Sequence, residues 1–230
     1  KSEDAIYIYN DIVGSGLVLS KGQTWKRHRK LISQTFHFEF LKEIVPMIAE
    51  TTDEMFETLK KTADLNNVDT MQEIQKITGE LVGRIFFGSE FCKYTFDGKP
   101  LTKAINDMTM QCGLMRYDMW RFIFGNRFVL AGILKKHREL KNNKERLREF
   151  CRKLIEERKK DLGQGTNLLT LLLNQQGQGQ EFLSDDEIVE EYITFFIAGM
   201  DTTGHLLTMV IYELSRNPDI LRKVKEDIET

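Results

Sequence analysis

The sequence has few prolines and cysteines and no long apolar run. Its three prolines leave room for long helices, because proline interrupts helix interiors and central strands. The three cysteines are scattered, and none lies in a CxxC or Cys/His metal spacing. This pattern predicts reduced thiols rather than a disulfide framework or a zinc site. No run approaches the roughly 20 apolar residues that a membrane-spanning helix needs.

The chain also has no large excess of positive or negative charge. The formal net charge is −2, so bulk electrostatics indicate no polyanionic partner, and we expect no binding to nucleic acid. The chain opens with KSEDAIYIYN, without Met or a signal-peptide pattern, and stops within an apparent helix, LRKVKEDIET. We therefore expect a piece of a longer protein. It would form a single partial domain over residues 1–230, with any targeting segment elsewhere in that protein.

Helical spacing of apolar residues dominates what is present, whereas alternating strand patterns are scarce. We therefore predict a mainly α fold. The predicted helices cover residues 40–61, 69–87, 101–117, 135–160, 168–174 and 184–216, with another from 218 and one around residue 25. FDGKP at 96–100 is typical of a turn, and polar, glycine-containing loops are expected at 161–167 and 175–180.

The longest predicted helix begins and ends at clear signals. Ser184 and Glu187 form a capping box, and Asn217 with Pro218 ends this helix and starts the next. A helix of that length spans roughly 45 Å and is expected to cross the whole domain. Its centre reads FFIAGMDTTGH, from Phe195 to His205, and combines an apolar start with glycine, aspartate and two threonines, which are poor helix formers.

Two interpretations of this centre stay open. One helix face carries, at about 100° per residue, the residues Phe195, Ala198, Gly199 and Thr202. The two small residues would let a flat or large group lie against the backbone. A bond from the Thr202 hydroxyl to the Ala198 carbonyl would loosen the helix beside Asp201, and an acid, an alcohol and a free carbonyl can deliver protons. Alternatively, the small residues allow a close helix crossing, with Asp201 in a salt bridge.

A second polar cluster occurs near the start of the chain. GSGLVLSKGQTWKRHRK, at 14–30, holds five Lys/Arg between positions 21 and 30. Trp25 and Arg29 are four residues apart, so they share a helix face, and His28 lies one position off that face. Indole and guanidinium groups both donate well to carboxylates. A solvated basic helix face is the alternative, and the glycine spacing does not match a nucleotide-binding loop.

Together these residues resemble the cytochrome P450 family. WKRHR, from Trp25 to Arg29, matches the WxxxR motif of that family. AGMDTT, from Ala198 to Thr203, matches its (A/G)Gx(D/E)T(T/S) motif on the long central helix. The flanks LSDDEIVEE and YELSRNPDI also resemble the surroundings of that helix. The resemblance covers nearly the whole chain in order, and it implies the central helical portion of the P450 fold.

The resemblance also implies a cofactor, haem b, and residues that would contact it. Trp25 and Arg29 would hydrogen-bond a haem propionate. Ala198 and Gly199 would lie over the distal haem face. The family's proximal ligand is a cysteine thiolate in a glycine-rich loop beyond the central helix, and neither that motif nor the ExxR helix occurs here. We therefore assign no metal ligand in this chain, and we expect native haem binding of the longer protein rather than of this part alone.

The implied activity is that of a haem-thiolate monooxygenase, which inserts one atom of O₂ into a small apolar organic substrate with electrons from a reductase. Asp201 and Thr202 would be the catalytic, proton-delivering pair, and Phe195 would line the substrate pocket. One alternative keeps the fold but isomerises or cleaves peroxides, a reaction that needs no proton relay. Another is a helical interaction module without a cofactor, or a pseudoenzyme.

Three surface features have alternatives of their own. The aromatic stretch at 119–134 either packs in the core or touches a membrane, since the resemblance puts it near the substrate entrance of microsomal members. The resemblance also implies that the longer protein lies on the cytoplasmic face of the endoplasmic reticulum, held by an N-terminal anchor outside this chain. The charged helix at 135–160 is typical of a solvated amphipathic helix. The basic helix at Trp25 either faces solvent or docks an acidic electron donor.

Overall fold

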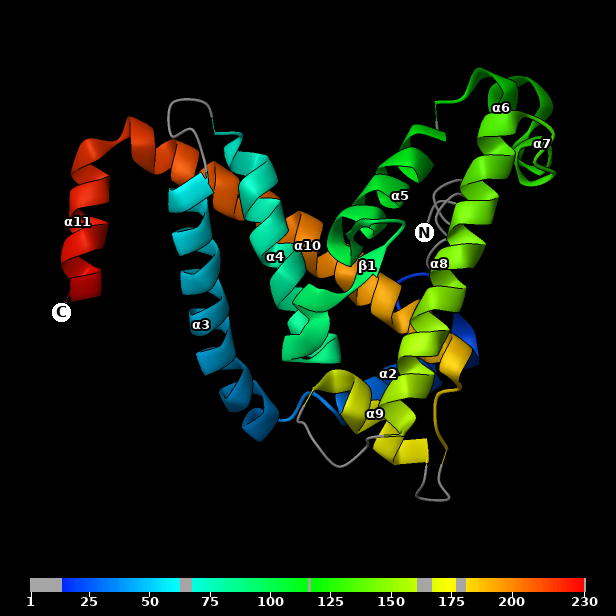
Figure 1. Cartoon of the computed structure of the whole chain (residues 1–230), viewed down its shortest axis with the longest axis horizontal. Coiled ribbons are helices and arrows are strands. Elements are labelled where there is room, and N and C mark those ends of the chain that lie inside the picture. The colour runs from blue at the N-terminus through cyan, green and yellow to red at the C-terminus, as the bar shows by residue number, and fades with distance from the viewer. Residues whose placement is uncertain (1–13, 63–67, 116, 161–166, 177–180, 230) are drawn as a thin grey trace.

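Long α-helices make up most of the structure, a computed structural model that describes residues 14–62, 68–115, 117–160, 167–176 and 181–229 (Figure 1). The predicted mainly α fold is confirmed. The helices are α2 (Gly22–Ser33), α3 (Phe38–Thr62), α4 (Thr70–Phe87), α5 (Leu101–Met115), α6 (Met119–Phe124), α7 (Asn126–Leu130), α8 (Lys135–Lys159), α9 (Leu168–Gln176), α10 (Asp185–Arg216) and α11 (Pro218–Glu229), with a 3₁₀ turn at Ser89–Lys93.

The predicted turn at 96–100 is a small hairpin. Strands β1 (Thr95–Phe96) and β2 (Lys99–Pro100) pair antiparallel, with Phe96 opposite Lys99. The two predicted loops lie largely at 161–166 and 177–180, outside the described residues. The second was expected to begin at residue 175, but Gln175 and Gln176 still belong to α9.

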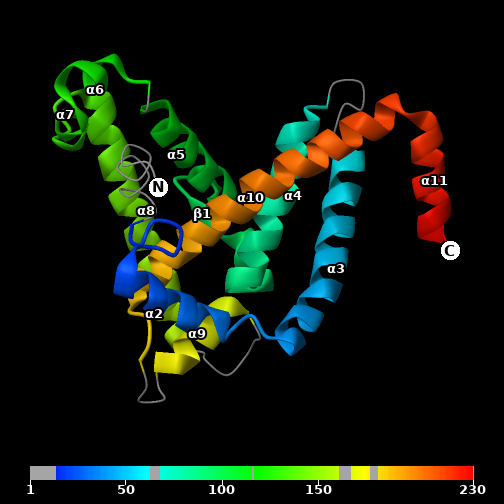
Figure 2. The ribbon, with the colours of Figure 1, turned by 180° about the vertical axis from the view of Figure 1, so that it is seen from behind.

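Helix α10 crosses the whole domain, as predicted (Figures 1 and 2). Its capping box is present: the Ser184 side chain accepts a hydrogen bond from the Glu187 N–H, and the Glu187 carboxylate accepts one from the Ser184 N–H. Pro218 opens α11 directly after the break. Among the described residues, α10 is also the one helix long and apolar enough, by length and composition alone, to cross a membrane. Its first half is buried in the core of this fold.

Helix α4 crosses α10 at very close range because glycines occupy the contact. A Cβ added at Gly199 would lie 2.7 Å from Cγ2 of Val82, and one added at Gly79 would lie 3.1 Å from Sδ of Met200. Neither distance leaves ordinary room for a side chain. The Thr78 hydroxyl then donates a hydrogen bond of 3.0 Å to the Met200 carbonyl across the interface. The glycines therefore bring the two backbones close enough for one helix to bond to the other.

Aromatic rings fill the core beside this crossing. Tyr192 of α10 lies between Phe86 and Phe87 of α4, with ring centroids 4.9 and 4.5 Å away. Phe196, one turn further along α10, contacts Phe91 at 6.4 Å. All five side chains are almost completely buried. Tilted and edge-to-face pairs of this kind contribute roughly 0.5–1.5 kcal/mol each beyond the burial of their area, so they fix the position of the first half of α10.

The aromatic stretch around α6 is exposed, so of the two alternatives for residues 119–134 core packing is wrong for most of it. Helix α6 buries none of its residues, and Phe122 is 91% exposed. Figure 1 shows α6 and α7 at one extremity of the molecule, at the end of α8. The exposed apolar side chains of this stretch, called here the α6 patch, are Met119, Trp120, Phe122, Ile123, Phe124 and Ile133.

A buried charged cluster joins α2 to α10. Nδ1 of His28 lies 2.6 Å from Oε1 of Glu191, and both side chains are fully buried. Nε2 of His28 lies 3.2 Å from Oε1 of Glu187, which Arg27 also contacts. The hydrogen bond to Glu191 raises the pKa of His28, although burial opposes it. Burial would raise the pKa of Glu187, but hydrogen bonds from the Ser184 backbone, Arg27 and His28 lower it. Two glutamates of α10 thus hold His28, one of them also holds Arg27, and the arrangement favours the charged form of the imidazole.

The raised pKa of His28 gives a pH-dependent stability. Its contribution is complete below the unfolded-state pKa of about 6.5 and is lost as the pH rises through the higher folded-state value. In the full-length protein, we expect the free energy of unfolding in urea to fall between pH 6 and 9. His28→Ala should cost about 3–5 kcal/mol at pH 6, because it leaves Glu191 with only the Leu17 N–H as a described partner.

The same substitution should flatten the pH profile. His37→Gln is the matched control, since His37 is an exposed histidine in the α2–α3 connection, and it should leave the slope unchanged. An equal slope in wild type and His28→Ala would contradict the assignment of this pH dependence to His28.

Candidate functional site

The central turn of α10 has one open side and one covered side. Ala198 and Thr202 are exposed, and Oγ1 of Thr202 donates a hydrogen bond of 2.6 Å to the Ala198 carbonyl. This confirms the predicted bond back along the helix. Gly199, in contrast, is half-buried with its missing side chain directed at Val82 of α4. The two interpretations of the sequence thus apply to different sides: Gly199 serves the helix crossing, while Ala198 and Thr202 border open surface.

Among the described residues, the Asp201 carboxylate has a glutamine and a histidine as side-chain partners, and no lysine or arginine pairs with it. Its Oδ1 accepts a hydrogen bond of 3.1 Å from Nε2 of Gln75 on α4, and it lies 3.2 Å from Nδ1 of His205 on its own helix. The Asp201 side chain is 51% exposed. The Asp201 carboxylate therefore stays in contact with solvent while Gln75 of α4 holds it. Thr202 is the next residue in the sequence.

Phe195 lies one turn before Ala198 and is half-buried. Its ring contacts Phe36, with centroids 5.6 Å apart, and Phe36 in turn contacts Phe40 edge-on at 6.1 Å. Phe36 lies in the connection between α2 and α3, so this aromatic contact joins that connection to α10. The structure therefore puts an aromatic side chain beside the open surface of Ala198. A role of Phe195 in binding substrate stays a prediction.

Trp25 and Arg29 are both exposed on α2, which meets the N-terminal part of α10 and then diverges from it (Figure 2). Their neighbour His28 turns inward to Glu191 and fixes the helix. Within the described part of the chain, Arg29 has no carboxylate partner, and no hydrogen bond joins Trp25 or Arg29 to residues 195–202. Both donors are therefore available to a carboxylate ligand, and the structure does not bring them into contact with the α10 residues.

The donor set fits the expected haem. Propionates are carboxylates, and the uncommitted indole N–H and guanidinium of α2 match them in hydrogen-bonding chemistry. The Ala198 methyl group presents little bulk to an apolar macrocycle, and the Thr202 hydroxyl lies on the same exposed side. Gly199 would have to contact the haem through its backbone, because Val82 covers the side of Gly199 that a Cβ would occupy.

Across the described segments, no three His, Cys, Asp or Glu residues are grouped so that they could hold a metal ion. Burial raises the pKa of Cys151 to about 12, so this thiol stays protonated and is a poor metal ligand. Cys112 is also buried, and Cys92 is exposed.

Sequence reasoning missed the residues of other helices that define the site. Gln75 and Val82 of α4 contact Asp201 and Gly199, and Glu191 holds His28. A partial signal exists for α4, because glycines four apart within a helix often mark a close crossing. Nothing in the sequence says which helix lies opposite them. Contacts between residues as distant in the chain as Gln75 and Asp201, which are 126 positions apart, leave no trace in local periodicity.

Comparisons with known proteins bear on both the fold and the site. The family model described as "Cytochrome P450" matches residues 5–230. The chain is 29% identical to cytochrome P450 4d8 of Drosophila melanogaster, covering 94% of this chain and 50% of that protein. It is 30% identical to a cytokinin hydroxylase of Arabidopsis thaliana, covering 95% of this chain and 43% of the relative.

A solved structure shares the path of the backbone. The crystal structure of the cytochrome P450DA heme domain superposes with a TM-score of 0.78 at 22% identity, covering 96% of this chain and 47% of that one. The chain thus spans half or less of the length of each of these proteins. Because the family model covers nearly all of its residues and the solved heme domain has the same arrangement of helices, the chain belongs to the cytochrome P450 family and forms a mainly α portion of that fold.

Proposed function

We propose that the protein containing this chain is a haem-thiolate monooxygenase. It inserts one atom of O₂ into a small apolar organic substrate and reduces the other to water with electrons from a reductase. The observation that carries the proposal is the open surface of Ala198 and Thr202 next to the solvent-accessible acid Asp201, in a chain of this family. When bound, haem supplies the oxygen-activating chemistry. The chain's own residues bind and orient it and move protons.

The roles follow from what each side chain can do. Trp25 and Arg29 donate hydrogen bonds to the propionates, and Ala198 leaves room on the distal side. Asp201 exchanges protons with solvent, and Thr202 passes them on, because a hydroxyl can donate one proton while it accepts another. Phe195 borders the substrate on the apolar side.

The alternatives lack this support. A peroxide isomerase or lyase has no use for an acid beside an alcohol, yet both groups are present and exposed. A helical module without cofactor would not need two uncommitted donors on α2. The relative from Arabidopsis is named as a hydroxylase, which agrees with oxygen insertion. A reduced carbon monoxide difference spectrum of the full-length protein, showing the thiolate-ligated band, is the first test; its absence would remove the proposal.

Removing the Thr202 hydroxyl should uncouple the reaction. In Thr202→Ala we expect product formation to fall roughly a hundredfold, the lower range for loss of a proton-transfer group, while electron consumption continues and peroxide accumulates. The measurement is product and hydrogen peroxide per NADPH consumed. Thr203→Ala is the matched control, because Thr203 is also exposed and one position along α10. Unchanged coupling in Thr202→Ala would refute the relay.

Removing the Arg29 guanidinium should weaken haem retention. We expect Arg29→Leu to retain a lower haem-to-protein ratio after gel filtration, while the circular dichroism of the helices is unchanged. Lys26→Leu, at an exposed position of the same helix, removes the same charge and should keep its haem. It should instead raise the KM for the reductase, if the exposed basic face of α2 docks that partner. Equal haem content in both variants would exclude Arg29 from the haem site.

The α6 patch supports contact with a membrane. We propose that it dips into the lipid surface on the cytoplasmic face of the endoplasmic reticulum, with an N-terminal anchor of the longer protein. Six exposed apolar side chains, two of them stacked as Trp120 on Phe124 with centroids 5.8 Å apart, are costly in water and favourable at a bilayer interface.

Tryptophan fluorescence tests this contact directly. In the full-length protein on vesicles that contain brominated phosphatidylcholine, we expect quenching of the Trp120 emission. The quenching should disappear in Trp120→Phe and persist in Trp25→Phe, since Trp25 lies on α2, outside the α6 patch. Quenching that is identical in the two variants would argue against the α6 patch as the membrane contact.

A further inference from the structure

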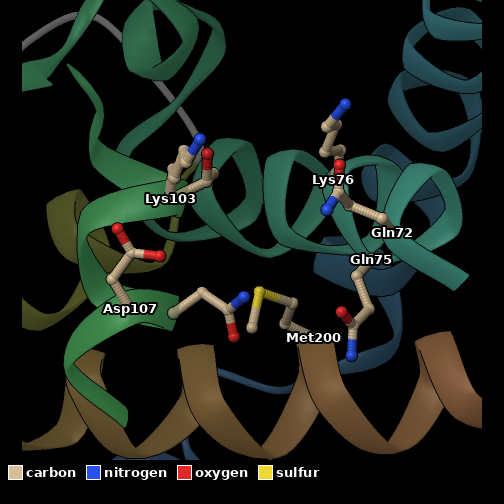
Figure 3. A pocket seen from close by; sticks show the side chains of 8 residues that line it. Gln72, Gln75, Lys76, Lys103, Asp107 and Met200 are labelled. Carbon is tan, nitrogen blue, oxygen red and sulfur yellow. The ribbon is translucent and has the colours of Figure 1, made fainter. Parts of the chain in front are cut away.

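A polar pocket lies behind the central turn of α10, between α4, α5 and α10 (Figure 3). Its volume is about 110 Å³, which is enough for several waters. The side chains that line it include Gln72, Gln75, Lys76, Lys103, Asp107 and Met200. Two of the charged groups are engaged elsewhere: Lys76 pairs with Glu73, and Asp107 with Lys99. Apart from Met200, every residue that lines the pocket has a polar or charged side chain.

Gln75 belongs both to this pocket and to the acid of the candidate site. Figure 3 shows its side chain reaching from α4 to α10 beside Met200. Its Nε2 donates to Oδ1 of Asp201 at 3.1 Å. A Cβ at Gly204 would lie 3.0 Å from Cγ of Gln75, so the glycine at that position makes room for the glutamine stem. Both helices are thus shaped so that this one amide reaches the Asp201 carboxylate.

The bond holds Asp201 on the α4 side of α10. Thr202 bonds to Ala198 on the exposed side, so the acid and the alcohol, although adjacent in sequence, are engaged with different surroundings. A neutral amide suits this arrangement, because it orients a carboxylate with one hydrogen bond and does not bind it as tightly as a lysine or arginine would.

We propose that Gln75 is a positioning residue for Asp201. It holds the half-exposed carboxylate on the α4 side of α10, where Asp201 takes a proton from solvent. When the hydrogen bond to Gln75 opens, the protonated Asp201 turns toward Thr202. It gives its proton to the Thr202 hydroxyl, which passes its own proton on, and Asp201 returns to Gln75 as a carboxylate. This inference rests on the proposed monooxygenase function, and it adds the side from which the acid is loaded and the residue that holds it there.

The test uses the haem-loaded full-length protein. Gln75→Met keeps the length of the side chain and removes the donor. We expect its ratio of peroxide to product to rise roughly three- to tenfold, the range for loss of one hydrogen bond, with unchanged haem content. Gln72→Met is the matched control, since Gln72 lines the same pocket from the same helix and makes no described side-chain bond to Asp201. An equal rise in both variants would overturn the role of the Gln75 bond.

A double-mutant comparison separates this inference from the proposed function. Asp201→Asn alone must uncouple the reaction; if it does not, the proton relay itself fails. If Asp201→Asn uncouples and Gln75→Met does not, only the role of Gln75 is refuted. In the Asp201→Asn background, Gln75→Met should add no further uncoupling, and an additive effect would show that Gln75 acts independently of the acid.

An infrared measurement provides a readout apart from turnover. The carboxylate band that Asp201→Asn removes should shift in Gln75→Met and stay in place in Gln72→Met. A band that does not shift in Gln75→Met would show that the amide does not hold the acid. If Gln75→Met lowers the haem content, Gln75→Leu replaces it, because it also removes the donor without adding a charge beside Asp201, with the same outcomes expected.

Discussion

The close crossing of α4 and α10 is the contact on which the rest of the structure depends. Gly79 and Gly199 remove the side chains that would separate the two backbones, and the Thr78 hydroxyl then reaches the Met200 carbonyl. Aromatic rings pack beside this point and bury the first half of α10. A side chain at Gly199 would collide with Val82 and displace α10 from α4, and one at Gly79 would press on the side chain of Met200.

The crossing also explains why α10 has its least helical residues at its centre. The glycine faces α4, where bulk is excluded by packing, whereas the alanine and threonine face outward, where bulk would be excluded by a ligand. Asp201 lies between these surroundings and is held by Gln75. One turn of α10 thus packs against α4 on one side and leaves an open surface on the other. Ala198, Gly199, Asp201 and Thr202 are the residues that allow both.

Local signals in the sequence were sufficient for the elements and for part of the site. The capping box at Ser184, the break at Pro218 and the bond from Thr202 to Ala198 were all predictable, because each depends on residues at most four apart. The contact of Gly199 with Val82 was not predictable, because Val82 is distant in sequence and the periodicity of apolar residues does not show which helices lie side by side. The sequence left the aromatic stretch at 119–134 open between core packing and surface exposure for a related reason: aromatic residues are buried unless the surrounding helices leave them uncovered.

The pairing of His28 with Glu191 spans 163 positions of the chain. At ribosomal rates of 5–20 residues per second, roughly 10 to 30 seconds separate the synthesis of these two partners. During that interval the basic segment of α2 has emerged without the carboxylates that neutralise it, so its histidine cannot yet be buried. The contact between α2 and α10 is consequently assembled late, after most of the helices between them have already been made.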